Sequence, residues 1–348
     1  MLCWGPMPDL SAAQKALLQT LGSSLERGRS SGVFHLAVGG PGSVPALTDL
    51  DVPELHLDLL PDPVTEEQRA VLTRLGYLRE AGEEERWSHP GGWRLVLPDS
   101  GSGWRAEQAA LRALLLEDAQ AAARYRRVFR ASGRGAADQA LQADATAHHV
   151  RTVGFRPARF VADTLQPLGL PWMFAGGLAL DLHLGRLARP HDDLDVVLPR
   201  AAQLQVRDEL SARGWRLDAC REGAYHAWSE PLLAPWHQAH ARHPDLPDVL
   251  LLDLLLTDLE DDLWRYRRDP RVTLPLAAAH RVSPDGLPYL APEAALLFKS
   301  GSAGRQPRGK DQRDFERLRP TLTAEARAWL AQALRLTAPE HPWLVALA

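Results

Sequence analysis

Two aspartates, Asp193 and Asp195, stand two residues apart in the 348-residue chain, in a predicted strand (193–198) that is otherwise apolar. In a strand, successive side chains point to opposite faces, so both carboxylates project from the same face. Two such carboxylates repel each other, and burying them without a cation would raise the pKa of one of them sharply. Mg²⁺ removes this cost and is commonly held by one or two carboxylates together with substrate phosphates. The pair therefore predicts a metal site for Mg²⁺ or Mn²⁺.

A glycine pair, Gly176-Gly177, precedes these aspartates by about 18 residues and lies between a predicted strand (172–175) and a predicted short helix (178–184). Without side chains, a phosphate can approach the backbone closely, and the N-terminus of the helix presents free N–H donors. A phosphate cradle followed by a carboxylate pair suits phosphoryl or nucleotidyl transfer, with ATP or another NTP as co-substrate.

A third carboxylate is expected, because two metal ions can clamp the attacking and the leaving oxygen of such a transfer. Asp253 interrupts the apolar run 250–256, where burying a lone charge would be costly, and we predict that it is a metal ligand, the catalytic base, or both. Asp258, at the end of the same predicted strand, is the alternative.

Basic side chains should neutralise the triphosphate. Only three of the 40 basic residues are lysines, namely Lys15, Lys299 and Lys310. We predict that Lys299 contacts the triphosphate, since a compact ammonium is chemically distinct from the planar guanidinium of arginine. Arg189 either binds the triphosphate or pairs with Asp192.

Nearby polar residues have structural interpretations. His191 is expected to support the loop or Asp193, and Asp181 to cap or orient Arg186. We expect Lys310 and Asp314 to tie the C-terminal helices to the core.

The rest of the chain is predicted to position these residues within an α+β fold. Strand patterns alternate with helix patterns in the first half, and the same alternation restarts near residue 158. The predicted helices are 11–27, 65–75, 105–130, 136–150, 158–168, 178–184, 201–213, 292–300, 310–318 and 323–336. The predicted strands are 34–38, 55–60, a pair within 87–97, 172–175, 193–198, 215–219, 224–229 and 249–257.

Composition excludes several classes of protein. The chain is 45% hydrophobic and 24% charged, which is close to the globular average. A net charge of −4 provides no global basic field for nucleic acid, and the two cysteines cannot form a disulfide framework. No signal peptide or membrane span is evident, so we expect a cytoplasmic protein without membrane partners.

The ordered motifs resemble a known superfamily. The glycine pair, then Arg189-x-His191-x-Asp193-Leu-Asp195, then the strand with Asp253, then Lys310-Asp311-x-x-Asp314-Phe315, are similar to polymerase-β-like nucleotidyltransferases. The closest similarity is to aminoglycoside and lincosamide adenylyltransferases, and it covers about residues 155–348. One departure is Gly177, where many members have serine, so backbone donors replace a serine contact to the phosphate.

This resemblance implies an enzyme that transfers NMP, most often AMP from ATP, to a hydroxyl of a small aminoglycoside- or lincosamide-like acceptor and releases pyrophosphate. It implies that Asp193 and Asp195 bind Mg²⁺ and that Asp253 is a ligand, a base or both. The alternatives are a nucleotide-binding regulatory protein without turnover, and a transferase acting on a protein or tRNA end. A basic cleft would favour a nucleic-acid acceptor, and a small closed pocket would favour an antibiotic-like one.

The first half resembles the GrpB-like family, itself of nucleotidyltransferase type, through Val44–Leu47, the strand 55–60, Leu75-Gly76-Tyr77 and Arg124-Tyr125. Gly40 precedes Asp58 by the 18 residues that separate Gly177 from Asp195, while His56 occupies the position of Asp193. We therefore predict two tandem nucleotidyltransferase-like domains: a degenerate one at 1–150 and an active one at 151–348. The second has a core at 151–276 and a helical part at 291–348.

One further motif, His237-x-x-His240-x-x-His243, has a spacing that could suggest zinc. No fourth ligand is evident, and prolines bracket the run, so we predict a loop near the mouth of the site.

Overall fold

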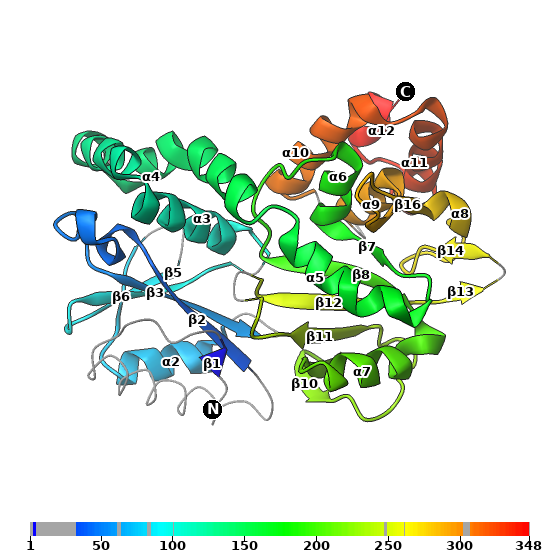
Figure 1. The fold of residues 1–348 in the computed structure, drawn as a ribbon, viewed down its shortest axis with the longest axis horizontal. Coiled ribbons are helices and arrows are strands. Elements are labelled where there is room, and N and C mark those ends of the chain that lie inside the picture. Colours follow the sequence, from blue (N-terminus) through cyan, green and yellow to red (C-terminus); the bar gives the residue numbers. More distant parts are fainter. Residues whose placement is uncertain are drawn as a thin grey trace.

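The computed structural model describes residues 3–4, 33–60, 64–81, 85–99, 101–246, 249–260, 262–301 and 307–347. The helix predicted at 11–27 lies outside these residues. The described part confirms a mixed α+β fold, in which sheets are flanked by helices and the chain ends in a helical segment (Figure 1).

The helices are α2 (Glu66–Arg74), α3 (Trp104–Glu117), α4 (Ala119–Thr152), α5 (Arg156–Leu165), α6 (Gly176–Leu184), α7 (Gln203–Ala212), α8 (Leu276–Ala279), α9 (Pro292–Lys299), α10 (Gly309–Leu318), α11 (Ala324–Thr337) and α12 (Trp343–Leu347). The strands of the first half are β1 (Cys3–Trp4), β2 (Val33–Gly39), β3 (Glu54–Leu60), β4 (Leu78–Arg79), β5 (Glu85–His89) and β6 (Trp93–Leu97). Those of the second half are β7 (Met173–Phe174), β8 (Asp193–Pro199), β9 (Arg216–Arg221), β10 (Ala224–Ala227), β11 (Gln238–Arg242), β12 (Leu251–Thr257), β13 (Leu259–Glu260), β14 (Leu263–Arg265), β15 (Thr273–Pro275), β16 (His280–Val282) and β17 (Pro288–Leu290).

Two sheets of the described residues repeat one pattern. The first has the order β1-β2-β3-β6-β5-β4, and the second has the order β10-β9-β11-β12-β8-β7-β17-β16. In the first, β3 is antiparallel to β2 and parallel to β6; in the second, β8 is antiparallel to β7 and parallel to β12. The outer neighbours also agree, since β5 and β11 run antiparallel to β6 and β12. This shared pattern is what two tandem domains would produce, and the limits 1–150 and 151–348 stay a prediction.

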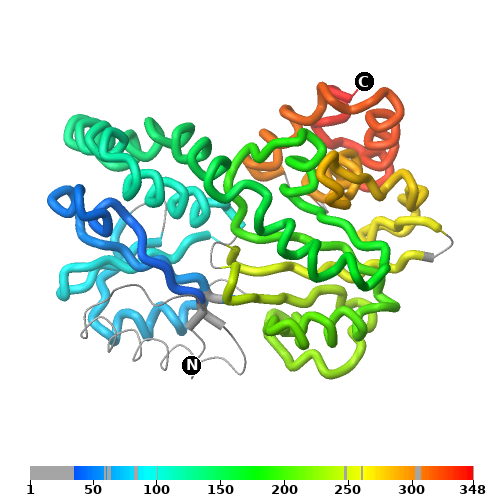
Figure 2. The backbone as a smooth tube through the Cα atoms, viewed as in Figure 1, coloured from blue at the N-terminus to red at the C-terminus, as the bar shows by residue number. Residues whose placement is uncertain are grey.

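The two sheets lie side by side, and α4 leads from the first half to the second (Figures 1 and 2). Helices α3 and α4 cover one face of the first sheet and α2 covers the other, while α9–α12 gather near the C-terminus (Figure 1). The second half has one large apolar core, and a small cluster of Leu60, Tyr225 and Leu251 joins the halves. No helix among the described residues combines the length and the apolar character needed to cross a bilayer.

Local sequence signals explain most element boundaries. Thr65 and Gln68 form the reciprocal capping box that starts α2. The helix predicted at 105–130 is instead interrupted, because the Asp118 carboxylate accepts hydrogen bonds from the backbone of Gln120 and Ala121 and starts α4 as a new helix. Residues 238–242, predicted as a loop, form the strand β11, since they pair with β9 on one side and β12 on the other.

Candidate active site

The glycine pair forms the turn between β7 and α6. Gly176 has a φ of 58°, in the left-handed region that favours glycine. A Cβ at this position would lie 1.8 Å from Oδ2 of Asp195, and one on Gly177 would lie 2.8 Å from Nη2 of Arg189. The absence of side chains therefore lets the start of α6 pack directly against the predicted metal ligand and against a predicted phosphate-binding arginine.

Two neighbouring strands bring the three predicted carboxylates together. Asp193 and Asp195 begin β8, and the parallel strand β12 pairs with it so that Asp253 lies directly beside Asp195. Because side chains of paired residues point to the same face, Asp195 and Asp253 project from one face of the sheet, as does Asp193 two residues away. All three line one cleft.

These carboxylates are electrostatically unbalanced. The side chains of Asp193 and Asp195 make no hydrogen bond or ion pair with any described residue. Burial and the charge of Asp193 raise the pKa of Asp195 to about 7. Burial, followed by the charges of Asp195 and Asp193, raises the pKa of Asp253 well above its ordinary value. For Asp195, burial and the repulsion from Asp193 outweigh the cations Lys299, Lys310 and Arg267, which oppose the rise of its pKa, and a bound Mg²⁺ would reverse this rise.

Asp253 is held by one oxygen and leaves the other free. Nε2 of Gln238 donates a 2.6 Å hydrogen bond to Oδ2 of Asp253, whereas the buried Oδ1 has no hydrogen-bond partner in the described structure. His240 lies behind this oxygen, with Nε2 at 3.7 Å, and its Nδ1 is 2.7 Å from the hydroxyl of Tyr225. Burial lowers the pKa of His240 to about 4, so its imidazole is neutral at pH 7. Sequence reasoning missed Gln238, which becomes significant only once β11 is a strand beside β12.

The carboxylates fit a magnesium ion. Their free oxygens are the hard donors that Mg²⁺ takes, and one or two carboxylates completed by phosphate oxygens and water suffice for it. No three His, Cys, Asp or Glu side chains of the described residues are placed to hold a metal ion by themselves. The pair of Asp193 and Asp195 therefore suits Mg²⁺ bound together with a triphosphate, and the further ligand role of Asp253 stays a prediction.

The cleft has a volume of about 270 Å³, and most of its other charged lining is cationic. It is lined by Gly101, Ala175, Gly176, Gly177, Arg189, His191, Asp193, Asp195, Val197, Asp253, Leu255, Thr257, Arg267, Arg268, Ala295, Phe298, Lys299, Arg308 and Lys310. Sequence reasoning missed Arg267, Arg268 and Arg308, because chain positions so far from the aspartates gave no sign of their location.

The predicted phosphate-binding cations differ in how freely they could act. Arg189 donates only to the carbonyl of Pro190 among the described residues and does not pair with Asp192. Lys299, in contrast, is buried and lies 3.1 Å from Asp311 and 2.8 Å from Asp314. These carboxylates neutralise Lys299 and fasten α9 to α10, so its role toward a triphosphate stays a prediction.

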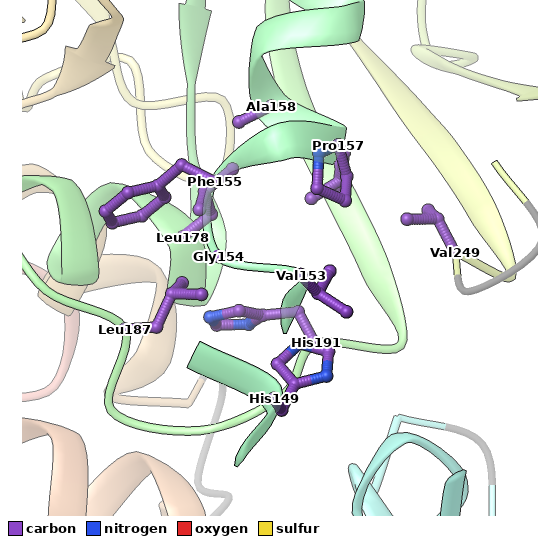
Figure 3. A pocket seen from close by; sticks show the side chains of 11 residues that line it. His149, Val153, Gly154, Phe155, Pro157, Ala158, Leu178, Leu187, His191 and Val249 are labelled. Atoms are coloured by element: carbon purple, nitrogen blue, oxygen red, sulfur yellow. The ribbon is translucent and has the colours of Figure 1, made fainter. Parts of the chain in front are cut away.

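His191 and Asp181 serve the loop before β8. Nε2 of His191 lies 2.8 Å from Oδ2 of Asp181, whose Oδ1 accepts a 2.8 Å hydrogen bond from Arg317. Asp181 thus orients His191 and Arg317, whereas the predicted partner Arg186 meets Asp181 through the backbone, where its N–H donates to the Asp181 carbonyl. Behind His191 lies a small, mostly apolar cavity at the junction of α4 and α5, lined by His149, Val153 and Leu187 among others (Figure 3).

The first half contributes a wall of the cleft. The Lys310 ammonium donates to the carbonyl of Gly101, in the loop before α3. Near this point the Asp192 carboxylate accepts a 2.7 Å hydrogen bond from the backbone of Ala106, and Nε of Arg105 lies 3.7 Å from both Asp192 and Asp58. Lys310 therefore joins the C-terminal helices to the first half. Burial and the nearby arginines Arg308 and Arg189 lower its pKa to about 8.

The corresponding place in the first sheet is filled by ion pairs. β3 begins with Glu54 and His56, as β8 begins with Asp193 and Asp195. Nε2 of His56 lies 3.2 Å from Glu54, and the guanidinium groups of Arg94 and Arg134 also bind this fully buried glutamate. The correspondence of His56 with Asp193, expected from the 18-residue spacing, stays a prediction.

The remaining candidates lie elsewhere. Asp258 is exposed and pairs with Arg200 at 2.8 Å, and it does not line the cleft. Of the three histidines considered for zinc, His240 faces Asp253, while His237 and His243 make contacts with the backbone carbonyls of Pro235 and Arg213.

Comparison with known proteins gives a match for the segment that contains the glycine turn. Residues 159–229, which contain the glycine turn and both aspartates of β8, match the family model of aminoglycoside-2''-adenylyltransferase. This confirms the resemblance that the motifs predicted and supports a nucleotidyltransferase enzyme. No curated protein matches the chain. The GrpB-like resemblance of the first half stays a prediction.

Several solved structures share a distant similarity. They include the lincosamide antibiotic adenylyltransferase LnuA with lincomycin bound (18% identity, 48% of this chain and 98% of that chain, TM-score 0.36). ANT(2")-Ia in complex with adenylyl-2"-tobramycin has 18% identity, covers 51% of this chain and 96% of that chain, and has a TM-score of 0.38. An antigenic nucleotidyltransferase-like protein from Paracoccidioides brasiliensis has 18% identity, covers 58% and 93%, and has a TM-score of 0.34. These similarities are too distant to define a substrate.

Proposed function

We propose that this chain is a Mg²⁺-dependent nucleotidyltransferase that transfers AMP from ATP to a hydroxyl of a small molecule and releases pyrophosphate. The observation that carries the proposal is the meeting of Asp193, Asp195 and Asp253 on one face of two paired strands, in a cleft that also holds the glycine turn. Such a cleft offers carboxylates that can bind a metal ion and, beside them, backbone that can bind phosphate.

The glycine turn and the carboxylates have different roles. The backbone at Gly176 and Gly177 and the side chains of Arg189 and Lys310 bind and orient the triphosphate, so that its charge is neutralised before reaction. Asp193 and Asp195 would hold Mg²⁺, which when bound stabilises the charge that develops on the phosphate oxygens.

Asp253 orients the acceptor and receives its proton. Its Oδ1 is unpaired and its Oδ2 is fixed by Gln238, so the free oxygen can accept the hydrogen of the acceptor hydroxyl. The acceptor oxygen forms a bond to the α-phosphorus, and the bond from that phosphorus to the pyrophosphate oxygen breaks. Burial raises the pKa of Asp253, which favours transfer of a proton to this carboxylate.

The test compares two aspartates of one segment: Asp253 lies within β12, and Asp258 directly follows this strand. Asp253→Asn keeps the volume and the contact with Gln238 but cannot accept a proton, so we expect turnover to fall by about 10²–10⁴. Asp258→Asn is the matched control, because Asp258 is exposed and outside the cleft, and it should remain within about threefold of wild type. The measurement is pyrophosphate release from labelled ATP with Mg²⁺ and a panel of acceptors, alongside nucleotide affinity by calorimetry.

The results separate the alternatives. Nucleotide binding should survive in Asp253→Asn, since Asp193 and Asp195 remain. Unchanged turnover in this variant would refute its role as the base, and a large loss in Asp258→Asn would transfer that role to Asp258. Nucleotide binding without pyrophosphate release, with every acceptor tested, would favour a regulatory protein without turnover.

A further inference from the structure

The charges that line the cleft point to the chemistry of the acceptor, given the proposed function. The only carboxylates among its described lining residues are Asp193, Asp195 and Asp253, and all three are assigned to the metal and to the base. The other charged lining groups are arginine and lysine side chains, of which Lys299 and Arg308 already pair with acids of α10. No lining carboxylate remains for an acceptor that carries several ammonium groups.

The lining cations other than Lys299 fall into two groups on different elements, and in the first of them Arg308 also pairs with Asp311 at 2.6 Å. Arg189, Arg308 and Lys310 surround the glycine turn and the loop of the first half: Nη2 of Arg189 is 2.8 Å from a Cβ built on Gly177, and Lys310 binds Gly101. This group is placed beside the phosphate cradle and suits the triphosphate.

Arg267 and Arg268 form the second group, between β14 and β15. Their guanidinium groups each lie 5.5 Å from the ring centre of Phe298, on α9. Arg268 donates to the carbonyl of Phe298 at 3.0 Å, and neither arginine pairs with a carboxylate among the described residues. The ring and the carbonyl fix these side chains without neutralising them, so their charge is available to a ligand.

The second group is separate from the glycine turn. The heavy atoms nearest to a Cβ built on Gly176 or Gly177 belong to Asp195, Arg189 and His191. Arg267 and Arg268 instead lie against Phe298, in the same cleft as Asp253. They are therefore the lining cations left for an acceptor whose hydroxyl meets Asp253.

We propose that the acceptor is a small hydroxyl compound that also carries an anionic group, a phosphate or a carboxylate, which Arg267 and Arg268 bind. A polycationic aminoglycoside would meet two guanidinium groups that no carboxylate neutralises. Its ammonium groups would find no free carboxylate in the cleft, and placing like charges side by side disfavours binding. Planar guanidinium forks, in turn, match phosphate and carboxylate oxygens.

The test measures affinity in the full chain saturated with Mg²⁺ and the non-hydrolysable analogue α,β-methylene-ATP. Calorimetry compares glucose 6-phosphate with glucose, glycerol 3-phosphate with glycerol, and tobramycin as the polycation. A hydrogen-bonded charge pair favours binding by about tenfold to a hundredfold. We therefore expect at least one phosphorylated probe to bind about tenfold or more tightly than both its neutral parent and tobramycin.

The double variant Arg267→Gln/Arg268→Gln should reduce that preference to within about threefold, while the affinity for the ATP analogue changes less than threefold. Arg271→Gln is the matched control, because Arg271 lies in the same segment but pairs with Asp269 at 2.6 Å outside the cleft, and it should keep the preference.

Three results would overturn the inference: tobramycin binding as tightly as the phosphorylated probes, no preference for either phosphorylated probe over its parent, or a preference that survives in the double variant. Tighter binding of a single-stranded oligoribonucleotide ending in CCA would also overturn it, in favour of a nucleic-acid acceptor. Failure of the proposed function has a different signature, since wild type would then release no pyrophosphate from ATP and Mg²⁺ with any acceptor tested, whichever probe it binds more tightly.

Discussion

Substituting Gly176 by alanine should disable the site by moving the carboxylate of Asp195. The same substitution at Gly185 is a control for the cost of placing alanine in a left-handed backbone conformation. Both glycines lie at the ends of the same helix, α6, and both have a φ in the left-handed region, 58° and 66°. An alanine in this conformation costs about 1–2 kcal/mol, so both variants should lose a similar free energy of unfolding from the backbone alone.

The two positions differ in what a side chain would meet. A Cβ on Gly185 has no heavy atom within 4 Å, whereas one on Gly176 lies 1.8 Å from Oδ2 of Asp195. Ordinary contact begins at 3.4 Å, so the carboxylate must withdraw by more than about 1 Å. Misplacing a group in an active site by about 1 Å can reduce turnover about a hundredfold.

The assay is pyrophosphate release from ATP with Mg²⁺ under saturating substrate, together with thermal unfolding of each variant. We expect Gly176→Ala to lose about a hundredfold in kcat, and Gly185→Ala to stay within about threefold of wild type despite a comparable loss of stability. If Gly176→Ala retained activity equal to Gly185→Ala, the close approach of the turn to Asp195 would not matter for function and the proposed site would be wrong.

Three further outcomes are expected. His56→Ala should leave transfer within a few-fold of wild type, because the first sheet holds its acids in ion pairs; a loss of about a hundredfold in pyrophosphate release would show that the first half takes part in catalysis. Arg105→Leu should lower the free energy of unfolding by about 3–5 kcal/mol in denaturant titrations, since it leaves the buried carboxylates of Asp58 and Asp192 uncompensated; a stability equal to wild type would contradict this junction. With a pKa of about 8, Lys310 loses its charge as the pH rises through 8, so kcat/KM for ATP should fall in this range. The variant Lys310→Arg should remove this fall, because arginine stays charged. An identical pH profile in both proteins would exclude Lys310 from binding the triphosphate.

Much of the candidate site could be predicted from the sequence because its residues are close together in the chain. The turn at Gly176 and the strand with Asp193 and Asp195 lie within twenty residues, and a glycine turn followed by two alternate aspartates is typical of a site for phosphate and metal. Asp253 could be predicted because a lone acid in an apolar strand is costly unless it has a partner. Its place directly beside Asp195 then followed from the parallel pairing of β8 and β12.

Errors arose where long-range pairing decides local structure. Residues 238–242 contain Gln, His and Arg and lie near prolines, features typical of a loop, yet two neighbouring strands satisfy their backbone and make them a strand. The break at Asp118 was missed for the opposite reason, since a local capping interaction interrupts an otherwise continuous helical pattern.

The sequence by itself determined most of the elements that position the site, the mixed α+β class and the choice of the three aspartates as candidate residues, because these depend on residue type and short spacing. Only the tertiary structure decided which cations face them. Arg267 and Arg268 reach the cleft from a different segment, Lys310 binds the first half of the chain at Gly101, and Lys299 is neutralised by Asp311 and Asp314. The charge that an acceptor meets is a sum over groups distant in sequence, and spacing along the chain holds no information on how those groups converge in space.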